Sequence, residues 1–153
     1  MKLTIKSLSK EAAIFADAES QHAEPALFGV TDGKAVGTYL EHKFRAYLFS
    51  KNYQFIAGNS ANGIDFPDLG IDLKVTSIRQ PQSSCPFRSA RQKIYGLGYA
   101  LLIFVYDKQD DVVKRVATLQ IVSAVLVEAE HTADFQLTRG LRDILQNEGN
   151  PDD

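Results

Sequence analysis

The sequence is poor in cysteine, with Cys85 the single example among 153 residues. One cysteine excludes an internal disulfide and a zinc site built from cysteines. No run approaches the roughly eighteen consecutive apolar residues that a membrane-spanning helix requires. The opening residues 1–6 are too few and too polar to begin a secretory signal. We therefore expect a cytoplasmic protein that is not associated with a membrane.

The chain also lacks a strong net charge. Its 17 basic and 19 acidic side chains give a formal charge of −2, so nucleic-acid binding cannot be argued from total charge. A composition of 44% hydrophobic and 24% charged residues is typical of one globular domain of this length. We predict a single domain over 1–153. Residues 150–153 (Asn-Pro-Asp-Asp) resemble the start of a helix, so we expect the chain to continue beyond 153.

Acidic residues are missing from one long interval. None occurs between Asp72 and Asp107. The same interval holds five basic side chains, namely Lys74, Arg79, Arg88, Arg91 and Lys93. A local basic face is therefore predicted, and it is either a solvated surface or a contact for nucleic acid.

The most informative stretch is 64–77, which begins with a predicted hairpin. Pro67 and Gly70 bound a Pro-Asp-Leu-Gly sequence typical of a four-residue turn, because proline presets one backbone angle and glycine tolerates positive φ. If residues 64–66 and 71–77 flank this turn as antiparallel strands, Phe66 faces Ile71. The residues next to them, both aspartates, then face each other.

That pairing would bring Asp65 and Asp72 to a Cβ separation of about 4.5–5.5 Å, at which like charges are destabilising. Strand alternation puts Lys74 on the face of Asp72, whereas Ile71, Leu73 and Val75 point the other way. A divalent cation held by the two carboxylates would compensate for their repulsion. The stretch therefore predicts a metal centre with a lysine beside it.

The remaining pattern predicts a mixed β-sheet with helices on its faces, an α/β (α+β) fold. Residues 122–130 suit a strand or a helix equally well. The expected elements are a helix over 9–20, a second helix capped by Thr31 or Asp32, a strand over 53–57, a polar loop over 79–87, a helix from Ser89 to Gly96 or Gly98, a buried strand over 100–106, a strand over 112–122 and a helix over 132–146.

The ten residues from Asp65 to Lys74 resemble a known motif. Asp-Phe-Pro-Asp-Leu-Gly-Ile-Asp-Leu-Lys is similar to the Asp-Phe-x-x-Leu-Gly-x-Glu-Leu-Lys pattern of MutH-like and type II restriction endonucleases, which belong to the PD-(D/E)xK nuclease superfamily. Asp72 stands where MutH-like proteins have glutamate, and the superfamily accepts either acid. The order of elements extends the resemblance over about 33–106, and it implies a restriction-endonuclease-like fold.

The resemblance also implies roles for individual residues. Asp65 and Asp72, with the backbone carbonyl of Leu73, would bind Mg²⁺, for which Mn²⁺ can substitute. Lys74 would complete the catalytic set. Family members often add a glutamate from the preceding helix, and Glu41 is the best-placed candidate, although it also suits a solvated helix position. Asp68, in the literal Pro-Asp pair, remains the alternative metal ligand, but its turn position cannot face Asp72.

The function implied is a Mg²⁺-dependent endodeoxyribonuclease of the type II restriction class, which cuts double-stranded DNA as a homodimer. A second possibility within that class is a nicking or junction-resolving enzyme. The competing possibility is a non-catalytic domain of the same fold that binds nucleic acid or protein. The DNA-binding candidates, suited to phosphate contact or to reading guanine, are Arg79, Arg88, Arg91 and Lys93.

Overall fold

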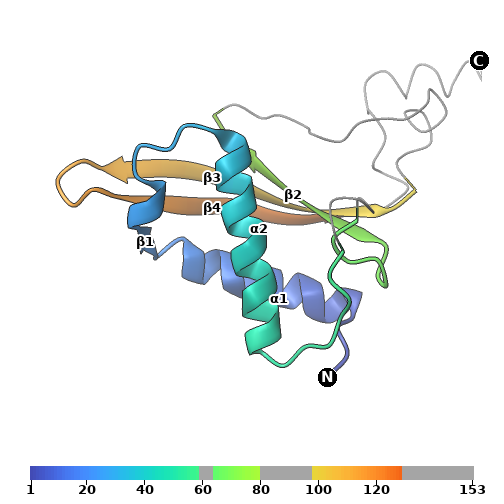
Figure 1. Cartoon of the computed structure of the whole chain (residues 1–153). Helices are drawn as coiled ribbons and strands as arrows, with labels where there is room; N and C mark the ends of the chain where they lie inside the picture. Colours follow the sequence, from blue (N-terminus) through green and yellow to red (C-terminus); the bar gives the residue numbers. More distant parts are fainter. Residues whose placement is uncertain (59–63, 80–97, 129–153) are drawn as a thin grey trace, which may run out of the picture.

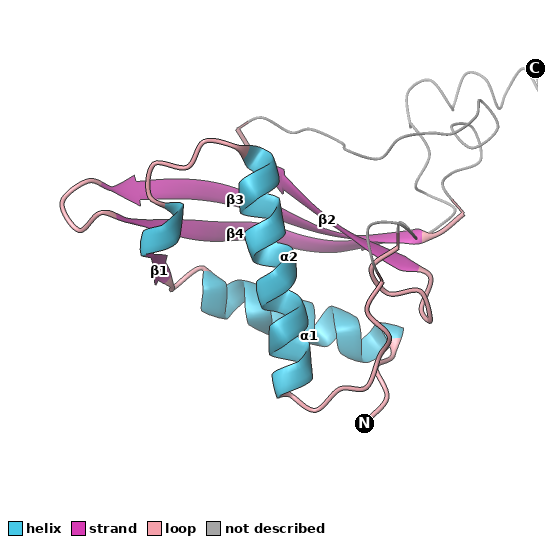
Figure 2. Ribbon diagram, in the orientation of Figure 1, coloured by secondary structure: helices cyan, strands magenta, loops and turns pink. Residues whose placement is uncertain are grey.

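The computed structural model describes residues 1–58, 64–79 and 98–128. Four strands in this part form one sheet in the order β1-β4-β3-β2, in which β2 and β3 are parallel and the other pairs antiparallel (Figures 1 and 2). The predicted mixed α/β class is confirmed. The elements are α1 (Ile5–Glu19), β1 (Ala23–Glu24), the 3-10 helix η1 (Pro25–Leu27), α2 (Gly33–Ser50), β2 (Ile71–Ser77), β3 (Ala100–Asp111) and β4 (Val116–Val127).

Side-chain caps determine where the two long helices begin. Thr4 accepts the Ser7 N–H at 3.1 Å, and the Ser7 hydroxyl accepts the Thr4 N–H at 2.9 Å, which makes a reciprocal capping box. The expected start of α1 at Ser9 was therefore wrong by one turn. Asp32 accepts the Lys34 N–H at 3.0 Å and caps α2, so it is the correct choice of the two expected caps.

Both long helices cover the same face of the sheet (Figure 1). The apolar stripe of α2 contains Val36, Leu40, Phe44 and Leu48, all fully buried, at a spacing of four residues that keeps them near one helical face. The Phe44 ring centroid lies 5.2 Å from that of Phe104 on β3. This packing attaches α2 to the centre of the sheet.

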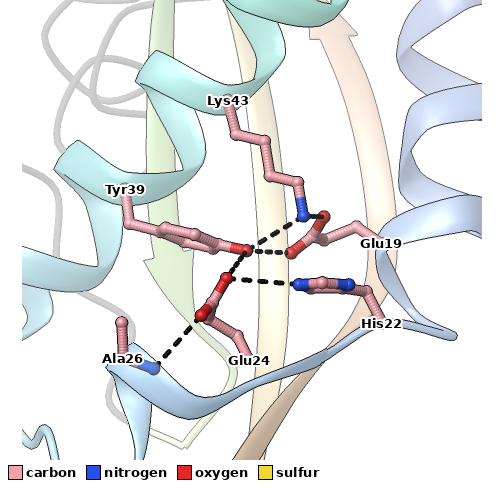
Figure 3. Close-up of polar contacts among 6 residues, drawn as sticks. All are labelled: Glu19, His22, Glu24, Ala26, Tyr39 and Lys43. Carbon is pink, nitrogen blue, oxygen red and sulfur yellow. Dashed lines mark hydrogen bonds and ion pairs between the residues drawn. The ribbon is translucent and has the colours of Figure 1, made fainter.

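Buried polar contacts join α2 to α1 near both ends of their interface. Tyr47 donates to Glu11 at 2.8 Å, and Tyr39 donates to Glu19 at 2.7 Å (Figure 3). Lys43 pairs with the second Glu19 oxygen at 2.7 Å, so this buried acid has partners at both oxygens. Burial, together with the hydrogen bond and charge of Glu19, raises the pKa of Tyr39 far above its usual range.

The same cluster extends to the short strand β1. Glu24 accepts the Ala26 N–H at 3.1 Å and contacts the His22 ring nitrogen at 3.2 Å (Figure 3). These contacts, with the Ala26 hydrogen bond foremost, lower the pKa of Glu24. The network holds α1, β1 and α2 together.

Two strand predictions were wrong at their ends. Residues 112–115 form a turn with Arg115 at φ 56, so β4 begins only at Val116. Val112 and Val113 lie at this turn with 76% and 92% of their surface exposed, and their hydrophobic character made the turn look like strand. β3 continues to Asp111, and residues 122–127, which suited either structure, are strand.

Strand pairing before β2 is less extensive than the sequence predicted. Residues 53–57 form no strand, because only Gln54 makes an isolated bridge, with Lys2. The expected hairpin retains β2, but residues 64–66 contribute one bridge, Phe66 to Ile71. The predicted helices over 89–98 and 132–146 fall wholly or largely outside the described residues. No helix within the described ranges is long and apolar enough to cross a membrane.

Candidate active site

A tight turn brings Asp65 against strand β2. The Phe66 N–H donates to the Ile71 carbonyl at 2.9 Å, and the Ile71 N–H donates back at 3.3 Å. Gly70 adopts φ 64, a conformation that glycine takes without steric cost. Because Phe66 pairs with Ile71, Asp65 must lie next to Asp72.

Two hydrogen bonds connect the aspartates through the backbone. The Asp65 N–H donates to Asp72 Oδ1 at 3.2 Å, and the Leu73 N–H donates to Asp65 Oδ2 at 2.9 Å. Asp72 is only 3% exposed. The predicted proximity of the two acids is therefore observed, although it depends on backbone-to-carboxylate bonds and a single bridge pair.

Alternation along β2 separates the core from the charged residues. Ile71 and Leu73 are buried in the hydrophobic core, and Val75 packs against it. Lys74, on the other side with Asp72, brings its Nζ to 3.1 Å from Asp72 Oδ2. Asp72 and Lys74 therefore lie on the same side of β2, as the alternation of side chains along a strand predicted.

Helix α2 adds an arginine that sequence reasoning missed. Arg45 Nη1 lies 2.9 Å from Asp65 Oδ1, and both side chains are less than one-fifth exposed. Arg45 follows Glu41 by four residues, a spacing at which helical side chains are neighbours. The sequence therefore shows that Arg45 lies near Glu41, but it does not show that Arg45 contacts Asp65.

Glu41 also belongs to this electrostatic environment. Burial raises its pKa, the positive charges of Arg45 and Lys74 oppose that shift, and the negative charge of Asp72 adds to it. The charges of Arg45, Lys74 and Asp72 therefore all act on this half-buried carboxyl group.

The pKa of Asp65 is raised to about 7. Burial is the largest cause, followed by the side-chain hydrogen bond with Asp72, and the charges of Asp72 and Glu41 act in the same direction. The Leu73 N–H opposes the shift because it favours the carboxylate. Asp65 consequently resists ionisation until the pH approaches neutrality.

The raised pKa predicts how stability depends on pH. The folded state holds the Asp65 proton more tightly than the unfolded chain, whose aspartates have a pKa of about 3.9. The associated stability is present below that value and is lost as pH rises through about 7. The melting temperature in the presence of a chelator should fall across this window, and Asp65→Asn should make the fall shallower. Glu41 leaves a residual slope, since its pKa is also raised.

The acids with lowered pKa values affect stability in a different pH range from Asp65. Glu11, Glu24 and Asp110 contribute stability that is lost as pH falls below their ordinary range, near 4. An Asp65→Asn protein with the same slope as the parent between about pH 5 and 7 would contradict the raised pKa of Asp65.

The other predicted residues are less closely associated with this group. Asp68 is exposed in the turn, and it is Asp65 that lies against Asp72. Arg79, just past the end of β2, pairs with Asp107 through Nε at 2.6 Å, and its side chain is 68% exposed. Arg88, Arg91 and Lys93 lie outside the described residues.

The arrangement suits a hard cation that accepts an incomplete set of protein ligands. Within 1–58, 64–79 and 98–128, no group of three or more His, Cys, Asp or Glu side chains could hold a metal ion by itself. Mg²⁺ does not require one, because it is usually held by one or two carboxylates with water and substrate phosphate. Asp65 and Asp72, close together and partly desolvated, fit that requirement.

The backbone of Leu73 fits as well. Ile71 exchanges both its N–H and its C=O with Phe66, since both groups of a strand residue point to the same side. Leu73, two residues further, donates its N–H to Asp65. Its carbonyl is thereby directed to the edge of β2 where the acids lie.

Comparison with known proteins gives the family. The family model for the type II restriction enzyme NspV matches residues 2–153. The type II restriction enzyme NspV of Nostoc sp. (strain ATCC 29411 / PCC 7524) is 69% identical over 151 residues, which cover 99% of this chain and 68% of that protein. No solved structure was found to match. The resemblance to restriction endonucleases is confirmed, and the chain belongs to the NspV family of type II restriction enzymes.

Proposed function

We propose that the protein hydrolyses phosphodiester bonds of double-stranded DNA at a Mg²⁺-dependent centre formed by Asp65, Asp72 and Lys74. The observation that carries this proposal is the enforced proximity of Asp65 and Asp72, whose backbone hydrogen bonds hold them together despite their like charge. Membership of a restriction-enzyme family supports the reaction class. We place the protein in the cytoplasm, because its proposed DNA substrate would be found there.

Asp65, Asp72 and the Leu73 carbonyl would hold the ion, and Mn²⁺ could replace it. A bound Mg²⁺ supplies Lewis-acid polarisation of the scissile phosphate and lowers the pKa of coordinated water. The hydrogen bonds from the Asp65 and Leu73 N–H groups orient the carboxylates, so that little reorganisation is needed when the substrate arrives.

Lys74 would act on the substrate itself. Its ammonium group is held beside Asp72, and its side chain is 26% exposed. There it would orient the attacking water and stabilise the charge that develops on the phosphate. Glu41, electrostatically coupled to Lys74 and Asp72, would hold a further metal-bound water or a second ion.

Lys74→Ala is expected to reduce DNA cleavage by about 100- to 1,000-fold, the loss typical of removing one preorganised charge from a transition state. The substrates would be a supercoiled plasmid and a long phage DNA that offers many candidate target sites, each with and without Mg²⁺. Linear products indicate double-strand cutting, and accumulated open circles indicate nicking.

Lys108→Ala is the matched control for this experiment, because Lys108 pairs with Asp110 on β3 away from the candidate site. It should cut like the parent protein. Cleavage that persists in a chelator, or that survives the loss of Lys74, would contradict the proposed centre.

The DNA interface is proposed for the basic interval after β2. Arg79 is well exposed at the end of that strand, and Arg88, Arg91 and Lys93 follow it in the sequence. Positive side chains that follow the acids in the sequence would position the backbone phosphates, and bidentate arginine would suit guanine. Cutting both strands would employ a homodimer, with one centre for each strand.

A further inference from the structure

The two aspartates share a pattern of contacts that the reaction does not explain. Each carboxylate uses one oxygen to accept a backbone N–H, Asp65 from Leu73 and Asp72 from Asp65. Each presents its other oxygen to a cationic side chain, Asp65 to Arg45 at 2.9 Å and Asp72 to Lys74 at 3.1 Å. Two single positive charges therefore contact the oxygens that remain for a divalent ion.

Of these two cations, Arg45 is the one without a part in the reaction described above. Arg45 comes from α2, whereas Asp72 and Lys74 come from β2 and Asp65 from the segment just before it. Its side chain is 19% exposed and that of Asp65 is 18% exposed, so water compensates poorly for the loss of either partner. Loss of Arg45 would remove the positive charge that contacts Asp65, while Asp72 would stay beside it.

We propose that Arg45 is a positioning residue that occupies Asp65 Oδ1 in place of a divalent cation and is displaced when the cation binds. This inference rests on the proposed metal centre. Glu41 lies one helical turn before Arg45, so in a site with one ion the displaced guanidinium can pair with its carboxylate. Arg45 thus keeps Asp65 in place in the metal-free protein, and it competes with the metal for the same oxygen.

The test compares melting temperatures in a chelator and across a titration of Mn²⁺ at about pH 8, where carboxylates are ionised. Arg45→Gln should melt several degrees below the parent in the chelator. Its gain on adding Mn²⁺ should exceed that of the parent, because the competitor is gone and binding to the folded state is measured directly by stability. We expect its apparent Mn²⁺ dissociation constant to fall by about 2- to 5-fold, as for removal of one ion pair.

Two further variants serve as controls for Arg45→Gln. Arg45→Lys keeps the charge and should remain near the parent in both conditions. Lys108→Gln removes a cation from the Asp110 pair, and any loss of stability it causes should be the same with and without Mn²⁺. Isothermal titration of Mn²⁺ into the parent and Arg45→Gln proteins gives the affinity independently of unfolding.

The alternatives give different outcomes. If Arg45→Gln melts lower by an equal amount with and without Mn²⁺, Arg45 is a structural ion pair and the inference is overturned. A weaker affinity for Mn²⁺ in Arg45→Gln would also overturn it, because Arg45 would then assist the metal. If the parent itself gains no stability and shows no binding, the proposed metal centre fails, and the inference fails with it.

Discussion

Asp72→Asn is expected to abolish DNA cleavage while leaving the fold intact. Asparagine keeps the shape of the side chain and an oxygen to accept the Asp65 N–H, so the turn should survive. It loses the negative charge that pairs with Lys74 and that a divalent cation requires. We expect single-turnover cleavage to fall by more than about 1,000-fold, comparable with losing the principal electrostatic contribution to the reaction.

DNA binding by Asp72→Asn should be unchanged or tighter. A buried carboxylate repels a phosphate placed beside it, and removing that charge lowers the cost of bringing the DNA in. Equilibrium binding to the same DNA, measured without cleavage in a chelator, separates this effect from catalysis. A protein that neither binds nor cuts would indicate a folding defect, which its thermal melt would reveal.

Asp68→Asn is the matched control for Asp72→Asn. It removes the same charge from the turn just before β2, but Asp68 is exposed and Asp72 is buried. Cleavage by Asp68→Asn should stay within a few-fold of the parent, as is usual for an exposed site. If Asp68→Asn stopped cleavage and Asp72→Asn did not, the metal ligands would have to be reassigned around the literal Pro-Asp pair.

Phe44→Ala is expected to cause the largest loss of stability. Phe44 is fully buried, and its ring centroid lies 5.1 Å from that of Phe15 and 5.2 Å from that of Phe104. Truncating such a side chain costs about 3–5 kcal/mol, against a typical total of about 5–15 kcal/mol for a domain. Because α2 also carries Glu41 and Arg45, this loss should loosen the candidate site as well. Chemical denaturation measures the effect.

Phe49→Ala on the same helix is the control for Phe44→Ala. The Phe49 ring stacks on that of Phe55 at 4.3 Å, yet Phe49 is 49% exposed. Its truncation should cost about 1 kcal/mol, the contribution of one aromatic pair. Equal losses for the two variants would contradict the identification of Phe44 as the centre of the core between the helices and the sheet.

Several predictions from sequence were wrong where long-range pairing decides the outcome. Residues 53–57 are apolar and aromatic, but among the described residues they pair only through the bridge of Gln54 to Lys2. Val112 and Val113 are hydrophobic, but the antiparallel return from β3 to β4 requires a turn at their position. Strand propensity depends on the partner strand, which the local sequence does not specify.

The proximity of Asp65, Asp72 and Lys74 was determined by the sequence itself, because turn chemistry and strand alternation act over only a few residues. Their catalytic roles remain predictions. The contact between Arg45 and Asp65 was decided only by the tertiary structure, since it joins residues twenty positions apart through the packing of α2 against β2. The polar network of Glu19, Tyr39 and Lys43 and the aromatic contacts of Phe44 hold that helix in place, and neither can be derived from the spacing of residues within one segment.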